Sequence, residues 1–136
     1  MAKLKGGKIG ILGGSFDPAH SGHLIISKIA LKKIKLKKIY WVVTKKNPFK
    51  VKTFFNLKDR IDKAKKISSK IKNIEVIHID NVIKSSKSIK VIQYILKKRK
   101  PKDLYFLVGS DVLLKFHKWH SWKKIVKLTK LIVFSR

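Results

Sequence analysis

The fold of this chain is decided by residues Gly13–Leu24, which read GGSFDPAHSGHL. A short apolar run at 8–12 precedes them and a periodic apolar pattern at 23–35 follows them. We therefore expect a strand, a glycine-rich turn and a helix in that order. This arrangement directs backbone N–H groups and the N-terminus of a helix at an anion. The stretch predicts a phosphate site.

Two histidines and the glycines around them carry this prediction. Gly13 and Gly14 let the backbone come close to a ligand, and Gly22 keeps the space between His20 and His23 free of a side chain. The histidines are three residues apart at a helix start, so both rings can point the same way. A lone histidine there is usually a polar cap, whereas this pair favours phosphate binding. A metal site is less favoured, because the chain has no cysteine and no third ligand lies nearby in sequence.

Strand-like and helix-like patterns alternate along the rest of the chain. We expect strands at 8–12, 38–44, 74–79, 104–108 and 131–134, and helices at 23–35, 57–71, about 85–100, 111–119 and 122–128. Asn56 can cap the second helix, Ser85, Ser86 and Ser88 offer caps for the third, and Pro101 ends it. The alternation predicts an α/β fold with a doubly wound parallel sheet, in a single domain spanning 1–136. Ligands of such sheets bind at the carboxyl ends of the strands, where Gly109-Ser110-Asp111 would join the opening motif.

The composition is that of a globular protein with an extreme charge. Of 136 residues, 44% are hydrophobic and the formal net charge is +28. Every basic residue except Arg60, Arg99 and Arg136 is lysine, and the lysines are spread over nearly every predicted helix. A nucleic-acid surface more often clusters arginine on one element. We interpret the charge as compositional; it predicts only salt-dependent, non-specific binding to nucleic acid and anionic lipid.

The absence of cysteine rules out disulfides, structural zinc on thiolates and thiol catalysis, and it fits a cytoplasmic protein. No apolar run approaches the length of a membrane span, and residues 1–10 lack the apolar stretch of a signal peptide. We expect a cytoplasmic protein that does not enter the membrane.

The motif GGSFDPAHSGHL resembles the signature of the HxGH nucleotidyltransferases, and its long form, GGxFDPxHxGH, is similar to that of bacterial nicotinate-nucleotide adenylyltransferases. Those enzymes make deamido-NAD and pyrophosphate from ATP and nicotinate mononucleotide, a step of NAD biosynthesis. The resemblance implies a Rossmann-like fold, Mg²⁺ entering with ATP, and His20 and His23 as the catalytic residues. It implies that ATP, through its phosphates or its ribose, also meets Gly13, Gly14, Ser15, Phe16, Gly22, Lys50, Gly109 and Asp111.

Further stretches share the resemblance, each with a simpler alternative. Asn47-Pro48-Phe49-Lys50 resembles the family's NPxK loop, although Lys50 is equally well a solvated lysine. Arg60 resembles the arginine that opens the next helix, and the alternative is an ion pair with Asp59, with Asp62 or with a helix end.

Gly109-Ser110-Asp111 with Trp119 resembles the family's GxDxxxxFxxW. That implies a contact of Asp111 with the ATP ribose and stacking of Trp119 on the nicotinate ring. The alternatives are a helix cap for Asp111 and ordinary core packing for Trp119. We prefer core packing for Trp122, and helix surface for His117 and His120.

The chain departs from the family pattern in two places. The family's YTxDT stretch is matched only by Lys87-Ser88-Ile89-Lys90-Val91, so Ser88 alone keeps a hydroxyl for the nicotinate side. The family's ISSTxxR segment, which holds ATP phosphates, is not among these 136 residues, so we expect a C-terminally shortened fold. That would expose apolar residues near Leu131 and Val133 and favour a homo-oligomer. Two alternatives stay open: an enzyme like pantetheine-phosphate adenylyltransferase, and a non-catalytic remnant that binds ATP or nucleic acid.

Overall fold

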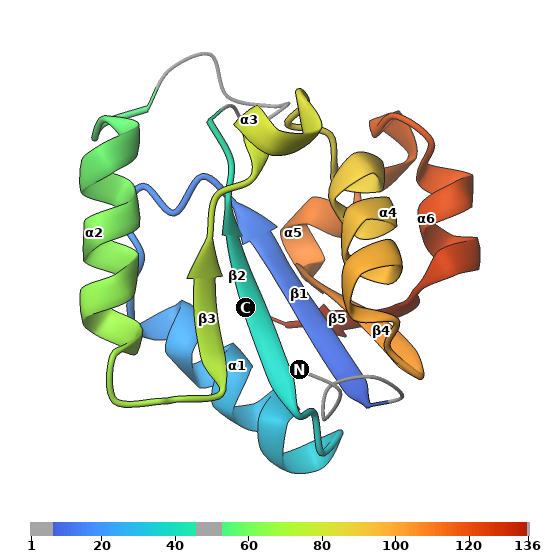
Figure 1. Cartoon of the computed structure of the whole chain (residues 1–136), viewed down its shortest axis with the longest axis horizontal. Helices are drawn as coiled ribbons and strands as arrows, with labels where there is room; N and C mark the ends of the chain where they lie inside the picture. The colour runs from blue at the N-terminus through green and yellow to red at the C-terminus, as the bar shows by residue number, and fades with distance from the viewer. Residues whose placement is uncertain (1–6, 46–52, 136) are drawn as a thin grey trace.

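The computed structural model describes residues 7–45 and 53–135, and this part of the chain contains a parallel sheet wrapped by helices (Figure 1). Its strands are β1 (Lys8–Gly14), β2 (Lys38–Val43), β3 (Ile74–Ile77), β4 (Asp103–Gly109) and β5 (Lys130–Phe134). They pair in the order β3-β2-β1-β4-β5, each parallel to its neighbours. The predicted doubly wound parallel sheet is confirmed, and β1 with the opening motif lies at its centre.

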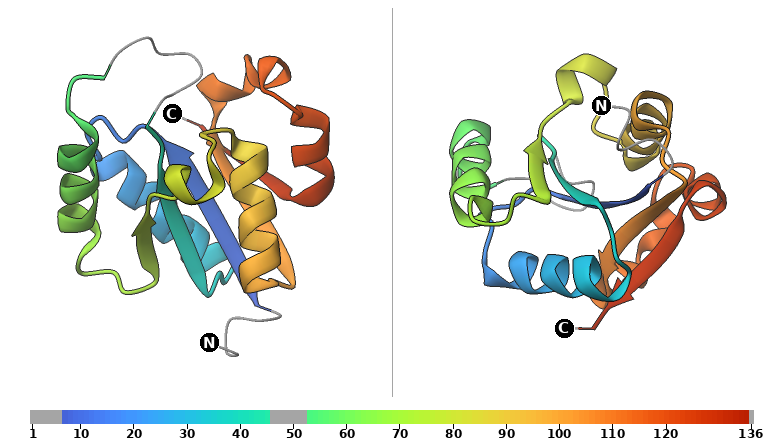
Figure 2. Two further views of the ribbon diagram at one scale, coloured as in Figure 1. Left: turned by 45° about the horizontal axis from the view of Figure 1, so that its top comes forward. Right: turned by 60° about the horizontal axis from the view of Figure 1, so that its bottom comes forward.

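Helices connect the strands and cover both faces of the sheet. They are α1 (Ser21–Lys33), α2 (Leu57–Ser68), α3 (Asp80–Ile83), α4 (Ser88–Arg99), α5 (Ser110–Leu113) and α6 (Trp122–Leu128), with a 3₁₀ turn, η2 (Phe116–Lys118). Helices α1 and α2 pack on one face, and α4 and α6 on the other (Figure 2). Because helices serve as the crossover connections between parallel strands, the carboxyl ends of all strands lie at one edge of the sheet.

Strand β2 shows why the sheet is covered on both sides. Its residues after Lys38 are all buried, and they alternate between the two cores. Tyr40 and Val42 join the cluster beneath α4, whereas Trp41 and Val43 join the cluster beneath α1 and α2. A nearly continuous apolar run is what a central parallel strand requires.

Helix α1 is fastened to this core by one buried polar pair. The indole Nε1 of Trp41 donates a hydrogen bond to the Ser27 hydroxyl over 2.8 Å, and both side chains are fully buried. Because a buried donor needs an acceptor, this bond sets the position of α1 against β2. At the next helix, the Asn56 side chain accepts from the Asp59 N–H at 2.8 Å, so the predicted cap of α2 is confirmed.

Several predicted boundaries are wrong, each for a physical reason. Helix α1 begins at Ser21, because His20 itself serves as the N-cap. The N-cap of α4 is Lys87, without a side-chain bond, so the serines do not cap that helix. The segment predicted as one helix over 111–119 divides into α5 and η2, with Trp119 extended beyond it. There the packing of Phe116 against Trp119, with ring centroids 5.5 Å apart, outweighs helix propensity.

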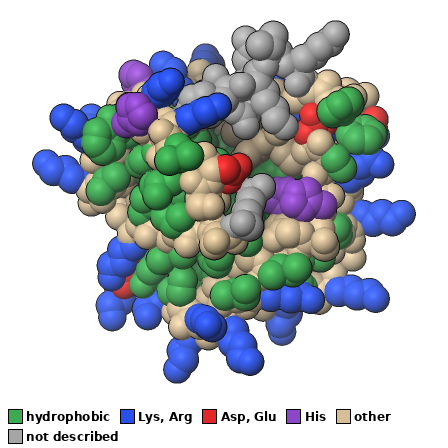
Figure 3. Space-filling model, turned by 180° about the vertical axis from the view of Figure 1, so that it is seen from behind, with side chains coloured by type: hydrophobic (Ala, Val, Ile, Leu, Met, Phe, Trp, Pro, Cys, Tyr) green, Lys and Arg blue, Asp and Glu red, His purple; other side chains and the backbone are tan. Residues whose placement is uncertain are grey.

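Basic side chains are distributed over many elements of the fold. Lysine and arginine side chains project all around the face seen in Figure 3, as the spread of lysines along the sequence predicts. At the edge strand β5, Val133 is 41% exposed while Leu131 is partly buried against the core beneath α4 and α6. The expected apolar exposure thus holds for Val133 only. None of the helices within 7–45 and 53–135 is long and apolar enough to cross a membrane.

Candidate active site

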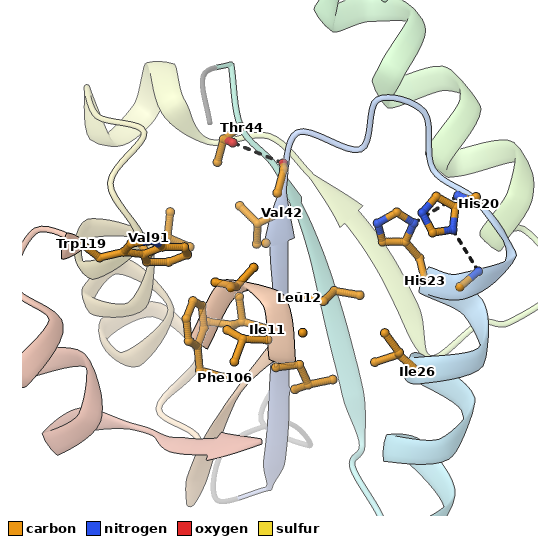
Figure 4. Close-up of a pocket in the computed structure, with 18 of the residues that line it drawn as sticks. Ile11, Leu12, His20, His23, Ile26, Val42, Thr44, Val91, Phe106 and Trp119 are labelled. Carbon is orange, nitrogen blue, oxygen red and sulfur yellow. Dashed lines mark hydrogen bonds between the residues drawn. The ribbon is translucent and has the colours of Figure 1, made fainter. Parts of the chain in front are cut away.

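A cavity of about 360 Å³ opens at the carboxyl ends of β1, β2 and β4 (Figure 4). Strand ends supply Gly13 and Gly14 from β1 and Gly109 from β4, and Thr44 follows β2 directly. The end of β1 and the start of α1 form one wall, which we call the histidine wall: Gly13, Gly14, His20, Gly22 and His23. The opposite wall, the tryptophan wall, consists of Ser88, Val91, Phe106 and Trp119.

The histidine wall is held by a reciprocal cap at the start of α1. The His20 Nδ1 accepts from the Gly22 N–H at 3.0 Å, and the His23 Nδ1 accepts from the His20 N–H at 3.1 Å. A ring nitrogen that accepts a hydrogen bond carries no proton, so the neutral form of each ring has its proton on Nε2. The cap therefore gives both imidazoles a donor at the tip of the ring, which is what a phosphate oxygen requires.

Ring packing fixes the orientation of the histidines further. The His20 and His23 ring centroids are 4.2 Å apart, and the Phe16 ring lies 4.5 Å from His23 and 5.3 Å from Trp41. Phe16 is buried and has a backbone φ of 49°, in the left-handed region that most residues avoid. Its packing against His23 and Trp41 stabilises that conformation and supports the His23 ring.

The glycines of the motif serve different purposes. A Cβ on Gly22 would lie 2.7 Å from the His20 Cε1 and 2.9 Å from its Nδ1, so any side chain here would displace the ring. A Cβ on Gly13 would meet nothing nearer than the Val42 carbonyl oxygen at 4.0 Å. Contacts within the described fold thus demand glycine at Gly22, whereas at Gly13 they leave room that a ligand can use.

The tryptophan wall is built by packing between distant segments. Trp119 stands edge-on to Phe106, with ring centroids 6.0 Å apart, and also contacts Phe116. Val91 comes from α4 and Phe106 from β4, on the side of the cavity away from the histidines (Figure 4). Trp119 therefore packs on the core, as one alternative predicted, and also lines the cavity, where its stacking on a nicotinate ring stays a prediction.

Most of the predicted site residues come together here. The cavity is lined by Gly13, Gly14, His20, Gly22, His23, Ser88, Gly109 and Trp119. Ser15 and Phe16 lie within the turn, are buried, and are not among the residues that line the cavity. Asp111 is exposed on α5 and does not line it either; it is not the N-cap of α5, which is Gly109. Lys50 falls outside the described residues.

The remaining predictions concern the surroundings of the site. His117 and His120 are exposed, as expected, and Trp122 packs against the core, 6.3 Å from the Phe116 ring. The alternative of an ion pair for Arg60 is wrong, because its guanidinium donates to four backbone carbonyl oxygens instead. The sequence analysis missed Thr44 and Ser86, both of which line the cavity. Thr44 could have been found, since it directly follows a central strand.

The described residues contain no group of three or more His, Cys, Asp or Glu side chains placed to hold a metal ion together. Asp80 has a carboxylate of the kind that binds metal ions, but it is engaged within the protein. It accepts hydrogen bonds from the Lys45 N–H at 2.9 Å and from the Ser86 hydroxyl at 2.5 Å. This buried carboxylate fixes the peptide after β2 and the hydroxyl of Ser86 at the rim of the cavity.

Comparison with known proteins agrees with this architecture. Residues 11–136 match the family described as cytidylyltransferase-like. A Pelagibacter ubique protein named "Probable nicotinate-nucleotide adenylyltransferase" is 51% identical over 129 residues, covering 95% of this chain and 71% of that protein. A protein of the same name from Nitratiruptor is 33% identical, covering 95% of this chain and 73% of its own length.

Solved structures show the same fold. Plasmodium falciparum nicotinic acid mononucleotide adenylyltransferase, solved in complex with NaAD, superimposes with a TM-score of 0.76 at 21% identity, over 96% of this chain and 65% of that one. At that identity the likeness establishes the fold, while the sequence matches establish the relationship. The chain belongs to the cytidylyltransferase-like family and, within it, to the nicotinate-nucleotide adenylyltransferases.

Proposed function

We propose that this chain transfers the adenylyl group of ATP to nicotinate mononucleotide, giving deamido-NAD and pyrophosphate. The observation that carries the proposal is the pair of imidazoles on the histidine wall, each with its Nδ1 occupied by a backbone N–H. That geometry prepares two Nε2–H donors at a cavity whose far wall offers an indole ring. The family membership supplies the reaction.

The reaction needs no nucleophile from the protein. A phosphate oxygen of nicotinate mononucleotide attacks the α-phosphorus of ATP, and the bond from that phosphorus to the bridging oxygen breaks. Pyrophosphate leaves with the electron pair. Negative charge gathers on the phosphoryl oxygens and on the leaving group, so catalysis consists of positioning and of hydrogen-bond donation to those oxygens. In this proposal His20 and His23 donate from Nε2.

The glycine-rich turn and Mg²⁺ would provide the remaining contacts with ATP. Gly13 and Gly14 let the polyphosphate approach the backbone, and Lys50 and Asp111 stay proposed contacts of the phosphates and of the ribose. Mg²⁺ would enter with ATP, bound by phosphate oxygens and water, and would neutralise part of the phosphate charge. On the other wall, Trp119 would stack on the pyridine ring while the Ser88 hydroxyl meets a polar group of the acceptor.

The test is pyrophosphate release by the purified 136-residue chain with ATP and Mg²⁺. Nicotinate mononucleotide, its amide and phosphopantetheine are supplied in turn as acceptors. We expect turnover with nicotinate mononucleotide. Turnover with phosphopantetheine alone would instead favour the pantetheine-phosphate adenylyltransferase reading, and no turnover with any acceptor would contradict the proposal.

A further inference from the structure

Arg60 is a buried cation that the proposed mechanism does not use. It is the fourth residue of α2 and only 2% exposed, although a guanidinium stays protonated throughout the physiological pH range. In the described part of the chain no ion pair joins it to a carboxylate; Asp62 on the same helix pairs with Lys58 instead. Burying a cation is unfavourable unless its surroundings compensate the charge.

The compensation comes from backbone carbonyl oxygens. Nη1 donates to two of them at 2.8 Å, Nη2 to one at 3.3 Å and Nε to one at 3.1 Å. The acceptors are, in that order, Ser15 and Thr44, then Lys45, then Phe55. One side chain thus joins the glycine-rich turn, the end of β2 and the segment before α2. Only the planar five-donor fork of arginine can reach all of these at once.

Holding the Ser15 carbonyl also sets the next N–H group. The Ser15–Phe16 peptide is trans, so its C=O and N–H point in opposite directions, and the Phe16 N–H points away from Arg60. The Gly14 carbonyl accepts from the Thr44 N–H at 2.9 Å and from the Thr44 hydroxyl at 3.2 Å. The Ser15 N–H is turned away from β2 in the same manner. The N–H groups of Ser15 and Phe16 are therefore each oriented by the carbonyl of the residue before them.

The turn contacts the same segment in return. The Asp17 carboxylate accepts from the Phe54 N–H at 2.6 Å and from the Phe55 N–H at 2.8 Å. Arg60 and Asp17 thus hold the backbone at Phe55 by its carbonyl and its N–H. Within the described residues, the groups that accept hydrogen bonds from the guanidinium are all backbone carbonyl oxygens.

We propose that Arg60 is a positioning residue for the polyphosphate of ATP. By holding the Ser15 carbonyl it aligns the Phe16 N–H, and by holding the Thr44 carbonyl it fixes the residue that in turn holds the Gly14 carbonyl and so orients the Ser15 N–H. Its buried Nη1 also places positive charge 2.8 Å from the carbonyl oxygen of Thr44, a residue of the cavity wall. An anion at the turn would interact with this charge in a region of low dielectric constant, where attraction is strong. This inference rests on the proposed function, because it takes a nucleotide polyphosphate as the ligand of the turn.

The first experiment compares ligands that differ only in phosphate. Arg60→Lys keeps the charge but loses most of the four bonds, and Arg60→Met loses both. Calorimetric titration should show ATP binding weakened at least about tenfold in both variants, with adenosine affinity within about twofold of wild type. Lys58→Met, which removes an exposed cation from the same helix, should change neither affinity. Equal losses for ATP and adenosine, or an unchanged ATP affinity in a folded Arg60→Met chain, would overturn the proposal.

A second experiment observes Arg60 by NMR in the wild-type chain, so its result does not depend on whether a variant folds. The Arg60 Nε–H resonance should shift when pyrophosphate is added and stay in place when adenosine is added. No shift with pyrophosphate would overturn the role of Arg60. These readouts use binding alone, so they separate from the proposed function, which fails if the wild-type chain binds ATP but releases no pyrophosphate with nicotinate mononucleotide.

Discussion

The two walls of the cavity are made in different ways. The histidine wall comes from one short stretch, and hydrogen bonds between residues two or three apart hold it. The tryptophan wall gathers side chains from α4, from β4 and from the segment after η2, held by contacts between rings. The first is local and polar, and the second is long-range and apolar.

This difference separates what the reaction demands from what the acceptor demands. Charge develops on phosphoryl oxygens in any adenylyl transfer, so the donors must be placed with an accuracy that a helix cap supplies. Recognition of a flat pyridine ring needs only a surface of the right shape, which packing supplies. Changes on the histidine wall should therefore affect kcat, and changes on the tryptophan wall should affect the KM of the acceptor.

The largest effect is expected at His23. His23→Asn keeps an acceptor near the Nδ1 position, so the cap of α1 survives while the Nε2–H donor is lost. We expect kcat to fall about a hundredfold or more, with thermal unfolding close to that of wild type. His23→Gln, which places an amide N–H near Nε2 but loses the cap acceptor, should recover part of the rate.

The control for His23 is His120→Asn, a change at an exposed histidine, which should leave kcat unaltered. Steady-state pyrophosphate release measures all three variants. A His23→Asn chain that keeps half of the wild-type rate would remove His23 from the mechanism.

Gly22→Ala tests whether the ring position of His20 matters apart from stability. The new Cβ would lie 2.7 Å from the His20 Cε1, so the ring must move, yet alanine favours a helix over glycine by about 1 kcal/mol. We expect kcat to fall at least about tenfold while the melting temperature stays level or rises. In a His20→Ala background the same change should cost little more, because the displaced ring is already gone. Additive losses in the double variant would mean that Gly22 acts by another route.

The contrast between local and long-range contacts also explains which features of the two walls the sequence predicts. The order of strands and helices, the cap at Asn56 and the pair of histidines depend on patterns within a few residues, and the structure confirms them. The apolar run of β2 likewise predicts its burial on both faces. Each of these features is determined by local chemistry that one segment contains.

Features that depend on tertiary contacts could not be predicted. For Arg60 the sequence left an ion pair with a carboxylate as an alternative, because a sequence does not show which carbonyl oxygens converge on one side chain. The division of 111–119 follows from the packing of Phe116 and Trp119, which no helical periodicity reports.

On the tryptophan wall, Trp119→Leu should raise the KM for nicotinate mononucleotide about tenfold and leave the KM for ATP unchanged, since ring stacking contributes about 1 kcal/mol. The KM of Trp119→Phe for nicotinate mononucleotide should lie between those of wild type and Trp119→Leu. Trp122→Phe controls for lost packing, because Trp122 contacts the same Phe116 ring but does not line the cavity. Kinetics with each substrate varied in turn would show the split; equal changes in both KM values would contradict it.

The smallest effect on catalysis is expected where the histidine wall meets the core. Ser27→Ala removes the acceptor of the Trp41 indole N–H, 2.8 Å away in a fully buried site, and leaves that donor unsatisfied. The free energy of unfolding should fall by about 1–3 kcal/mol, whereas kcat should stay within about twofold, because the cap of α1 is formed by His20 and His23 and does not use Ser27. Adding Trp41→Phe to Ser27→Ala removes the unsatisfied donor and should recover part of the stability when measured by urea unfolding. If Ser27→Ala instead lowered kcat as much as Gly22→Ala does, the histidine wall would depend on the placement of the whole helix rather than on its local cap.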